Sequence, residues 1–229
     1  MKTIGLMGGM SWESSQLYYQ IINETAREKL GGLHSAKSLI FSFDFAEIEA
    51  LQHAGNWGEA TRRMIEAAQS LEKGGADFVL ICTNTMHKMA KEVAANISVP
   101  LIHIAEPTAQ AIKAQGAKKV GLLGTKFTME QDFYKGWLEN VGIEVVIPNE
   151  ADRQIVHDVI YNELCLGIIK EPSKQEYLRI IDSLKDQGAE GVILGCTEIT
   201  LLVKQEDSSL PVFDTTRIHA ETAVEIALR

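Results

Sequence analysis

Two cysteines, Cys82 and Cys196, are the residues of this sequence best suited to chemistry. Each is followed by a threonine and stands at the end of a short apolar run that is typical of a buried strand. A cysteine between a strand and a helix start lies in the positive end of the helix dipole, which lowers a thiol pKa from about 8.5 toward neutrality. The free N–H groups of the same turn can bind a carboxylate. The sequence therefore predicts an activated thiolate beside an anion cradle, twice.

A pair of equivalent thiols suits the inversion of a carbon centre. Racemisation removes the Cα proton from one face and returns a proton to the other, so one base serves only one face well. A thiolate and a thiol on opposite sides of a substrate can exchange these roles between the forward and reverse reactions. General acid/base catalysis of this kind contributes roughly 10²–10⁴-fold in rate, and stabilisation of the developing carbanion in a desolvated cleft supplies more. The alternative is a purely structural role, in which both cysteines are small hydrophobic residues of the core.

An internal repeat places the two cysteines in matched positions. Cys82-Thr83 corresponds to Cys196-Thr197, 114 residues further on, and three more landmarks recur in the same order. These are Gly5–Gly8 with Gly121–Gly124, Ser70–Asp77 with Ser183–Glu190, and Val99–Ile102 with Leu210–Phe213. Four landmarks that recur in the same order, at offsets of 111 to 116 residues, indicate two homologous halves that arose by duplication.

Strand-like runs alternate with segments of helical spacing along the chain, which predicts an α/β fold. We expect two pseudo-symmetric α/β domains, each with a mostly parallel four-stranded sheet flanked by helices. Residues 1–98 plus 210–229 should form the first domain and 99–209 the second, with the active site in the cleft between them. The expected strands are Thr3–Met7, Ser38–Phe43, Phe78–Ile81, Leu101–Ile104, Val120–Leu123, Glu144–Ile147, Gly191–Leu194 and Pro211–Phe213.

Composition excludes several classes of protein. The chain has 229 residues and a formal net charge of −9, with no basic cluster to meet the phosphates of a nucleic acid. No apolar run approaches the roughly 18 residues of a membrane helix, and the chain starts directly on a strand-like run, so we expect a cytoplasmic protein. Its three cysteines are an odd number, which argues against a disulfide framework. No CxxC or HxxxH spacing suggests a metal, and we expect none.

The sequence resembles the aspartate/glutamate racemase family over essentially its whole length. The motifs that carry the resemblance are Gly8-Gly9-Met10-Ser11-Trp12, Cys82-Thr83-Asn84-Thr85-Met86-His87, Gly124-Thr125-Lys126-Phe127-Thr128 and Gly195-Cys196-Thr197-Glu198. The resemblance implies cofactor-independent interconversion of the L and D forms of aspartate, glutamate or both, with no pyridoxal phosphate and no metal. Cys82 and Cys196 would be the catalytic pair. Relatives are often dimers, so a homodimer is expected by analogy.

The resemblance also implies how the substrate is held. Backbone and hydroxyl donors of one set of residues would bind its α-carboxylate and amino group: Met10, Thr83, Asn84, Thr85, Thr125 and Thr197. Apart from the resemblance, the position of Glu198 just after Cys196 makes it a candidate for orienting the ammonium group, with a solvated carboxylate at a helix start as the equal alternative. Aspartate-specific relatives carry an arginine and a lysine for the distal carboxylate, near Glu47 and Cys165 of this sequence, and both are missing here. Gln52, Lys126 and Arg217 are the candidates to replace them.

Other interpretations stay open at this stage. Hydantoin racemases, maleate isomerases and arylmalonate decarboxylases use related motifs on the same scaffold. A catalytically idle amino-acid-binding protein is a different class of explanation, and a thiol redox sensor is a third. His87 stands five residues after Cys82, about 140° from its face on a regular helix, which favours a supporting or capping role over a direct Cys–His pair. A catalytic role is disfavoured for His103 and His219.

Overall fold

The computed structural model describes residues 1–229 as two compact units. Unit 1 comprises Met1–Ile104 and His219–Arg229, and unit 2 comprises Ala105–Ile218. These bounds differ from the expected ones at residues 98/99 and 209/210. The reason is strand pairing, because β4 (Leu101–Ile102) pairs with β3 of the first sheet and β8 (Val212–Asp214) pairs with β7 of the second.

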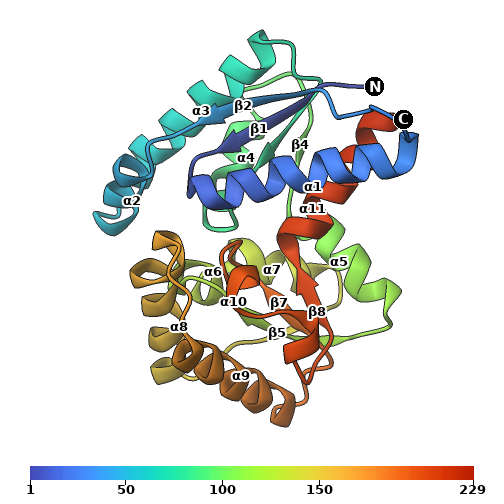
Figure 1. Cartoon of the computed structure of the whole chain (residues 1–229). Coiled ribbons are helices and arrows are strands. Elements are labelled where there is room, and N and C mark those ends of the chain that lie inside the picture. The colour runs from blue at the N-terminus through green and yellow to red at the C-terminus, as the bar shows by residue number, and fades with distance from the viewer. The chain divides into compact units, whose positions relative to one another are not determined.

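Unit 1 is built on a four-stranded parallel sheet with the strand order β2-β1-β3-β4 (Figure 1). Its strands are β1 (Ile4–Gly8), β2 (Ser38–Ser42), β3 (Phe78–Ile81) and β4. Every residue of the central strands β1 and β3 is buried, as expected for parallel strands covered on both faces. The continuous apolar runs of the sequence are therefore explained by burial on both sides of the sheet.

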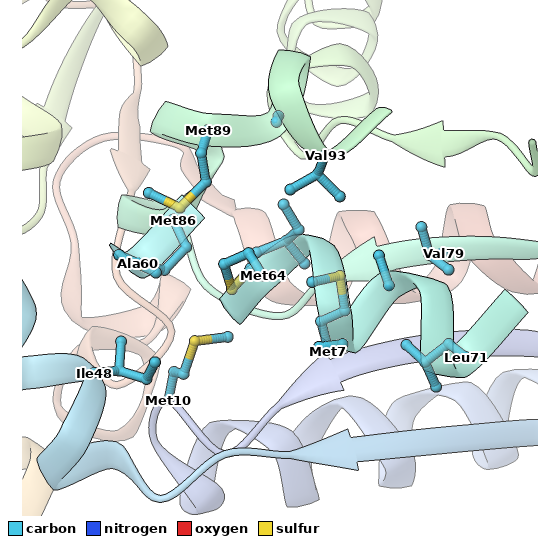
Figure 2. Close-up of a cluster of buried hydrophobic side chains, with 14 of the residues drawn as sticks. Met7, Met10, Ile48, Ala60, Met64, Leu71, Val79, Met86, Met89 and Val93 are labelled. Atoms are coloured by element: carbon cyan, nitrogen blue, oxygen red, sulfur yellow. The ribbon is translucent and has the colours of Figure 1, made fainter. Parts of the chain in front are cut away.

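Two separate cores cover the two faces of this sheet. On one face, α1 (Trp12–Leu30) packs with the part of α11 (Thr215–Leu228) that belongs to unit 1. On the other face lie α2 (Phe45–His53), α3 (Trp57–Lys73), the short 3-10 helix η1 (Thr85–Met89) and α4 (Ala90–Ala94). The second core contains a methionine cluster, shown in Figure 2, of Met7, Met10, Met64, Met86 and Met89. Alternate residues of β1 and β3 belong to the two different cores, because successive side chains of a strand point to opposite faces of the sheet.

Unit 2 repeats the same plan with the strand order β6-β5-β7-β8, again all parallel. Its strands are β5 (Lys119–Leu123), β6 (Glu144–Val146), β7 (Val192–Leu194) and β8. Its helices are α5 (Ala105–Ala114), α6 (Lys126–Glu130), α7 (Asp132–Asn140), α8 (Glu150–Asn162), α9 (Glu171–Asp186) and α10 (Ile199–Leu202), with the 3-10 turns η2 (Leu164–Leu166) and η3 (Gln205–Asp207). No helix in either unit is long and apolar enough to span a membrane. All eight expected strands are present, and the predicted fold class is confirmed.

The strand order fixes where a ligand can bind in each unit. In each sheet the second strand lies on one side of the first strand, and the third strand lies on its other side. The carboxyl ends of β1 and β3, and of β5 and β7, therefore form the switch points at which open parallel sheets hold their ligands. Cys82 directly follows β3, and Cys196 follows β7 after a single glycine.

The turn after β1 depends on Gly9. This residue has φ +83°, and a Cβ there would lie 2.4 Å from both the backbone N and the backbone O of Phe43. Its own N–H donates to Ser15 Oγ at 2.7 Å, and Ser15 lies in the first turn of α1. The backbone of β1's turn therefore packs directly against the backbone that follows β2, with no room for a side chain.

We expect Gly9→Ala to lower the free energy of unfolding by about 3 kcal/mol or more, since backbone strain and a backbone clash add together. Gly55→Ala is the matched control, because Gly55 has φ +66° with no atom within 4 Å of a Cβ. That control should cost about 1 kcal/mol from the left-handed backbone alone. Urea denaturation followed by circular dichroism measures both, and equal losses would contradict the predicted clash.

Candidate active site

Cys82 is held by the sheet itself at the end of β3. Its backbone N–H donates to Met7 O at 3.0 Å, which continues the ladder between β1 and β3 by one residue. The side chain is buried, with 1% of its surface exposed. The thiol thus lies at the switch point of unit 1, where the sequence predicted it.

The expected activation of this thiol by a helix dipole is wrong. Burial raises the pKa of the Cys82 thiol well above its usual value. The helix that follows is the 3-10 helix η1, which begins only at Thr85, and its N-cap Asn84 makes no capping bond with its side chain. A short helix that starts three residues away has too small a dipole to offset the loss of solvation of a thiolate.

Cys196 has a different partner. Its thiol donates to Glu198 Oε2 at 3.0 Å, and the hydroxyl of Thr197 donates to the same oxygen at 2.7 Å. Glu198 is buried, with 3% of its surface exposed. The pKa of the Cys196 thiol lies well above its usual value, first because of burial and next because of the charge of Glu198, with a smaller contribution from Cys165. Here too the predicted lowering is wrong, and the carboxylate holds the thiol in its protonated form.

In unit 2 the carboxyl end of β5 lies close to the turn between β7 and Cys196. A Cβ on Gly124 would lie 2.9 Å from the carbonyl oxygen of Gly195, so the two glycines let the ends of β5 and β7 meet. Thr125 follows as the N-cap of α6, and its Oγ1 accepts a bond from the N–H of Thr128 at 3.3 Å. Thr125 and Cys196 are therefore presented from adjacent strand ends, as the repeat predicts.

The predicted substrate-binding residues of unit 1 gather around η1. Gln52 comes from α2 and donates from Nε2 to Met86 Sδ at 3.1 Å. Met10 belongs to the same methionine cluster as Met86, and Figure 2 shows both among its labelled side chains. Asn84 and Thr85 directly precede Met86 and are buried. Thr83, next to the cysteine, is half-buried.

The other two candidates for the distal carboxylate, Lys126 and Arg217, belong to unit 2. Lys126 donates from Nζ to the side chain of Gln154 on α8. The backbone N–H of Arg217, not its guanidinium group, donates to Asp214 Oδ1 at 3.0 Å in the first turn of α11. Glu47 is ion-paired with Arg63, at a surface pocket of about 470 Å³ between the end of β2 and α3. No group of three His, Cys, Asp or Glu side chains is arranged to hold a metal ion.

Sequence reasoning missed a buried network of histidines in unit 1. His87 Nδ1 lies 2.8 Å from Thr83 O, in the supporting role that its position on the helix favoured. His219 Nε2 lies 3.0 Å from Ile102 O, and its Nδ1 lies 2.9 Å from the hydroxyl of Tyr18. Unit 1 contains five histidines, and nothing in their sequence spacing shows that His87, His103 and His219 come together.

Comparison with known proteins gives one consistent result. The model of the Asp/Glu/Hydantoin racemase family matches residues 7–223. The broad specificity amino-acid racemase RacX of Bacillus subtilis (strain 168) is 29% identical over 174 residues, which cover 74% of this chain and 73% of RacX. A candidate Asp/Glu racemase from Yersinia pestis has a solved structure with a TM-score of 0.93 at 54% identity. PH1733, an aspartate racemase homologue from Pyrococcus horikoshii OT3, has a TM-score of 0.87 at 38% identity. Both structural alignments cover 100% of each chain.

Replacing Glu198 should change the titration of Cys196. We expect Glu198→Gln to lower the pKa of the Cys196 thiol, because the variant removes the negative charge that now opposes thiolate formation. The measurement is the pH dependence of iodoacetamide alkylation in a Cys82→Ala, Cys165→Ala background, in which Cys196 is the one remaining cysteine. Glu163→Gln is the matched control, because Glu163 is also a carboxylate of unit 2 and lies at the C-terminal end of α8. An unchanged or higher pKa in Glu198→Gln would contradict the bond between thiol and carboxylate.

Proposed function

Because the chain belongs to the Asp/Glu/hydantoin racemase family, we propose that it interconverts the L and D forms of aspartate, glutamate or both without a cofactor. The observation that carries this proposal is the matched placement of Cys82 and Cys196, each at the switch point of its own parallel sheet. Two thiols of the same chemistry are what inversion at Cα needs, since either can take the proton that the other returns.

In the proposed reaction one cysteine acts as base and the other as acid. The reaction starts from the form in which the Cys196 thiol, 3.0 Å from Glu198 Oε2, has lost its proton to solvent while Cys82 keeps its own. The thiolate takes the Cα proton, and the electron pair of the broken C–H bond moves onto the carbanion. The thiol of Cys82 then donates its proton to the opposite face of Cα, so that Cys196 ends as thiol and Cys82 as thiolate. After the product leaves, proton exchange with solvent returns Cys82 to the thiol and Cys196 to the thiolate. The opposite enantiomer reacts through the same steps in reverse.

Binding of the substrate supports this chemistry in two ways. Its ammonium group favours a nearby thiolate, which opposes the rise in thiol pKa that burial causes in the free protein. Backbone N–H groups and hydroxyls at the two switch points, from Thr83–Thr85, Thr125 and Thr197, are the donors that we propose for the α-carboxylate. Gln52 and Met10 would complete the wall of the site on the η1 side.

A wider substrate range is the second candidate. The carboxylate of Glu47 pairs with Arg63 and so neutralises a cation on this side of unit 1. Because RacX carries the name of a broad specificity racemase, amino acids without a distal carboxylate belong in any screen of this protein. Hydantoin racemisation is the further alternative that the family description names.

We expect solvent deuterium to enter Cα of both enantiomers of the substrate, with inversion, when the protein is incubated in D₂O without added cofactor. Nuclear magnetic resonance of L- and D-aspartate and of L- and D-glutamate measures this exchange. Cys82→Ala and Cys196→Ala should each lower the racemisation rate by about 10²–10⁴-fold, since each removes one acid/base group.

Cys165→Ala is the matched control for these variants, because Cys165 is a cysteine outside any disulfide to which the mechanism gives no role. It should retain racemisation. Inversion that persists in either Cys82→Ala or Cys196→Ala would disprove the two-thiol mechanism. Calorimetric binding of an amino acid that never exchanges its Cα hydrogen would instead identify a catalytically idle binding protein.

The rate should also rise with pH. Burial raises the pKa of both thiols, so the protonated forms dominate at neutral pH and the fraction with a thiolate grows as pH increases. For one ionisation, kcat/KM should rise by up to about tenfold per pH unit until the thiolate form is reached. Initial rates between about pH 6 and pH 9 test this. A profile that falls over this range would contradict raised thiol pKa values in the working enzyme.

A further inference from the structure

His87 links the turn that carries Cys82 to a second backbone segment. Its Nδ1 lies 2.8 Å from the carbonyl oxygen of Thr83, and its Nε2 lies 3.1 Å from the backbone nitrogen of Ile104. Ile104 is the last residue of unit 1 before the chain enters unit 2. The imidazole is buried, with 2% of its surface exposed. Both ring nitrogens are therefore occupied by main-chain groups.

These two bonds admit one form of the ring. A carbonyl oxygen can only accept, so Nδ1 must carry the hydrogen, and a backbone N–H can only donate, so Nε2 must be bare. The neutral Nδ1–H tautomer satisfies both, whereas a protonated ring would direct an N–H at the N–H of Ile104. Burial lowers the pKa of His87 well below its usual value, and His103 and His219, with ring centroids 4.6 and 6.0 Å away, lower it further. Tyr18 faces the cluster through its bond to His219.

The backbone on both sides of the Cys82–Thr83 peptide is thereby fixed. The N–H of Cys82 is held by Met7 of β1, and the carbonyl of Thr83 is held by His87. The helix η1 that carries His87 follows this turn at once, and the N–H of His87 itself donates to Asn84 O at 3.0 Å. His87 therefore binds the carbonyl oxygens of both Thr83 and Asn84, the two residues that follow Cys82.

The second half of the repeat has no side chain in the matching position that could make these hydrogen bonds. The residue that matches His87, 114 positions further on, is Leu201 in α10, which can make no side-chain hydrogen bond. Cys196 has its carboxylate partner Glu198 instead. The two cysteines therefore occupy matched places in the fold but are supported by different chemistry.

We infer that His87 is a positioning residue for the Cys82 half of the reaction: its neutral imidazole holds the Cys82–Thr83 turn through the Thr83 carbonyl and leaves the Cys196 half untouched. This inference rests on the proposed function, in which Cys82 exchanges a proton with Cα. His87 takes no part in proton transfer itself, because both of its nitrogens are bonded to the main chain.

Two substitutions at His87 each remove one of the two hydrogen bonds that its side chain makes. The side-chain amide of asparagine reaches about as far as Nδ1, so His87→Asn keeps a donor for Thr83 O and loses the acceptor for Ile104. The amide of glutamine reaches about as far as Nε2, so His87→Gln keeps the acceptor and loses the donor. We expect His87→Gln to lower kcat/KM by about 10²-fold, as misplacement of a reacting group does, and His87→Asn to lower it clearly less.

The informative readout is the Cα-deuterium isotope effect on kcat/KM, measured from each enantiomer. In His87→Gln it should increase for the enantiomer whose proton Cys82 removes, since that step becomes slower, and decrease for the other. A loss of folded protein lowers the rate but leaves both isotope effects unchanged. His53→Gln, at an exposed histidine paired with Glu49 on α2, is the control and should match the natural protein. Unchanged isotope effects together with equal rate losses in the two His87 variants would overturn the inference.

A second measurement needs no turnover and so separates this inference from the proposed function. In a Cys165→Ala, Cys196→Ala background, iodoacetamide should alkylate Cys82 faster in His87→Gln than in His87→Asn, because the released turn exposes the buried thiol. Equal rates would overturn the inference whether or not the protein racemises amino acids. Nitrogen-15 shifts of His87 in the natural protein should show hydrogen on Nδ1, and hydrogen on Nε2 would overturn it as well. Absence of racemisation with altered alkylation would count against the proposed function alone.

Discussion

Burial of a thiol at the end of a parallel strand is the constraint on which the rest of each unit depends. A thiolate loses solvation there, so the free protein keeps both cysteines protonated. Every polar group nearby then has to be neutral or matched to a partner, since an unpaired buried charge is costly. The neutral ring of His87 and the shared oxygen of Glu198 are the two solutions that this chain uses. The chemistry proposed for the protein begins from these protonated thiols.

Duplication has preserved the backbone plan more strictly than the side chains that serve it. Both sheets have the same strand order, and both cysteines follow the third strand of their sheet. The support around them has diverged, with a histidine bound to main-chain groups in one half and a carboxylate bound to the thiol in the other. A racemase needs equal access to two faces of one carbon, but it does not need equal surroundings for its two bases.

The sequence predicts the sheets well because each strand is an apolar run that recurs in the second half in the same order. It misplaces the domain bounds, since a repeat shows which segments match and leaves open which sheet the strands near Leu101 and Val212 join. The strand-end positions of Cys82 and Cys196 are predicted correctly, whereas the predicted pKa shift of their thiols has the wrong sign. That sign depends on burial and on where the following helix starts, and both are set by tertiary packing. The tautomer of His87 depends likewise on two main-chain partners, one of them 17 residues away along the chain.

The helix α11 has a consequence for the order in which the chain can be completed. Its residues Ala220, Ala223, Val224 and Ala227 fill the core on the α1 face of the first sheet, so unit 1 draws on both ends of the sequence. Unit 2 is continuous from Ala105 to Ile218. During synthesis from the N-terminus, the whole of unit 2 has therefore been made before the last core helix of unit 1 exists. Unit 1 therefore begins to be synthesised before unit 2 but is completed after it. Until α11 has been made, that helix cannot cover the apolar face of α1.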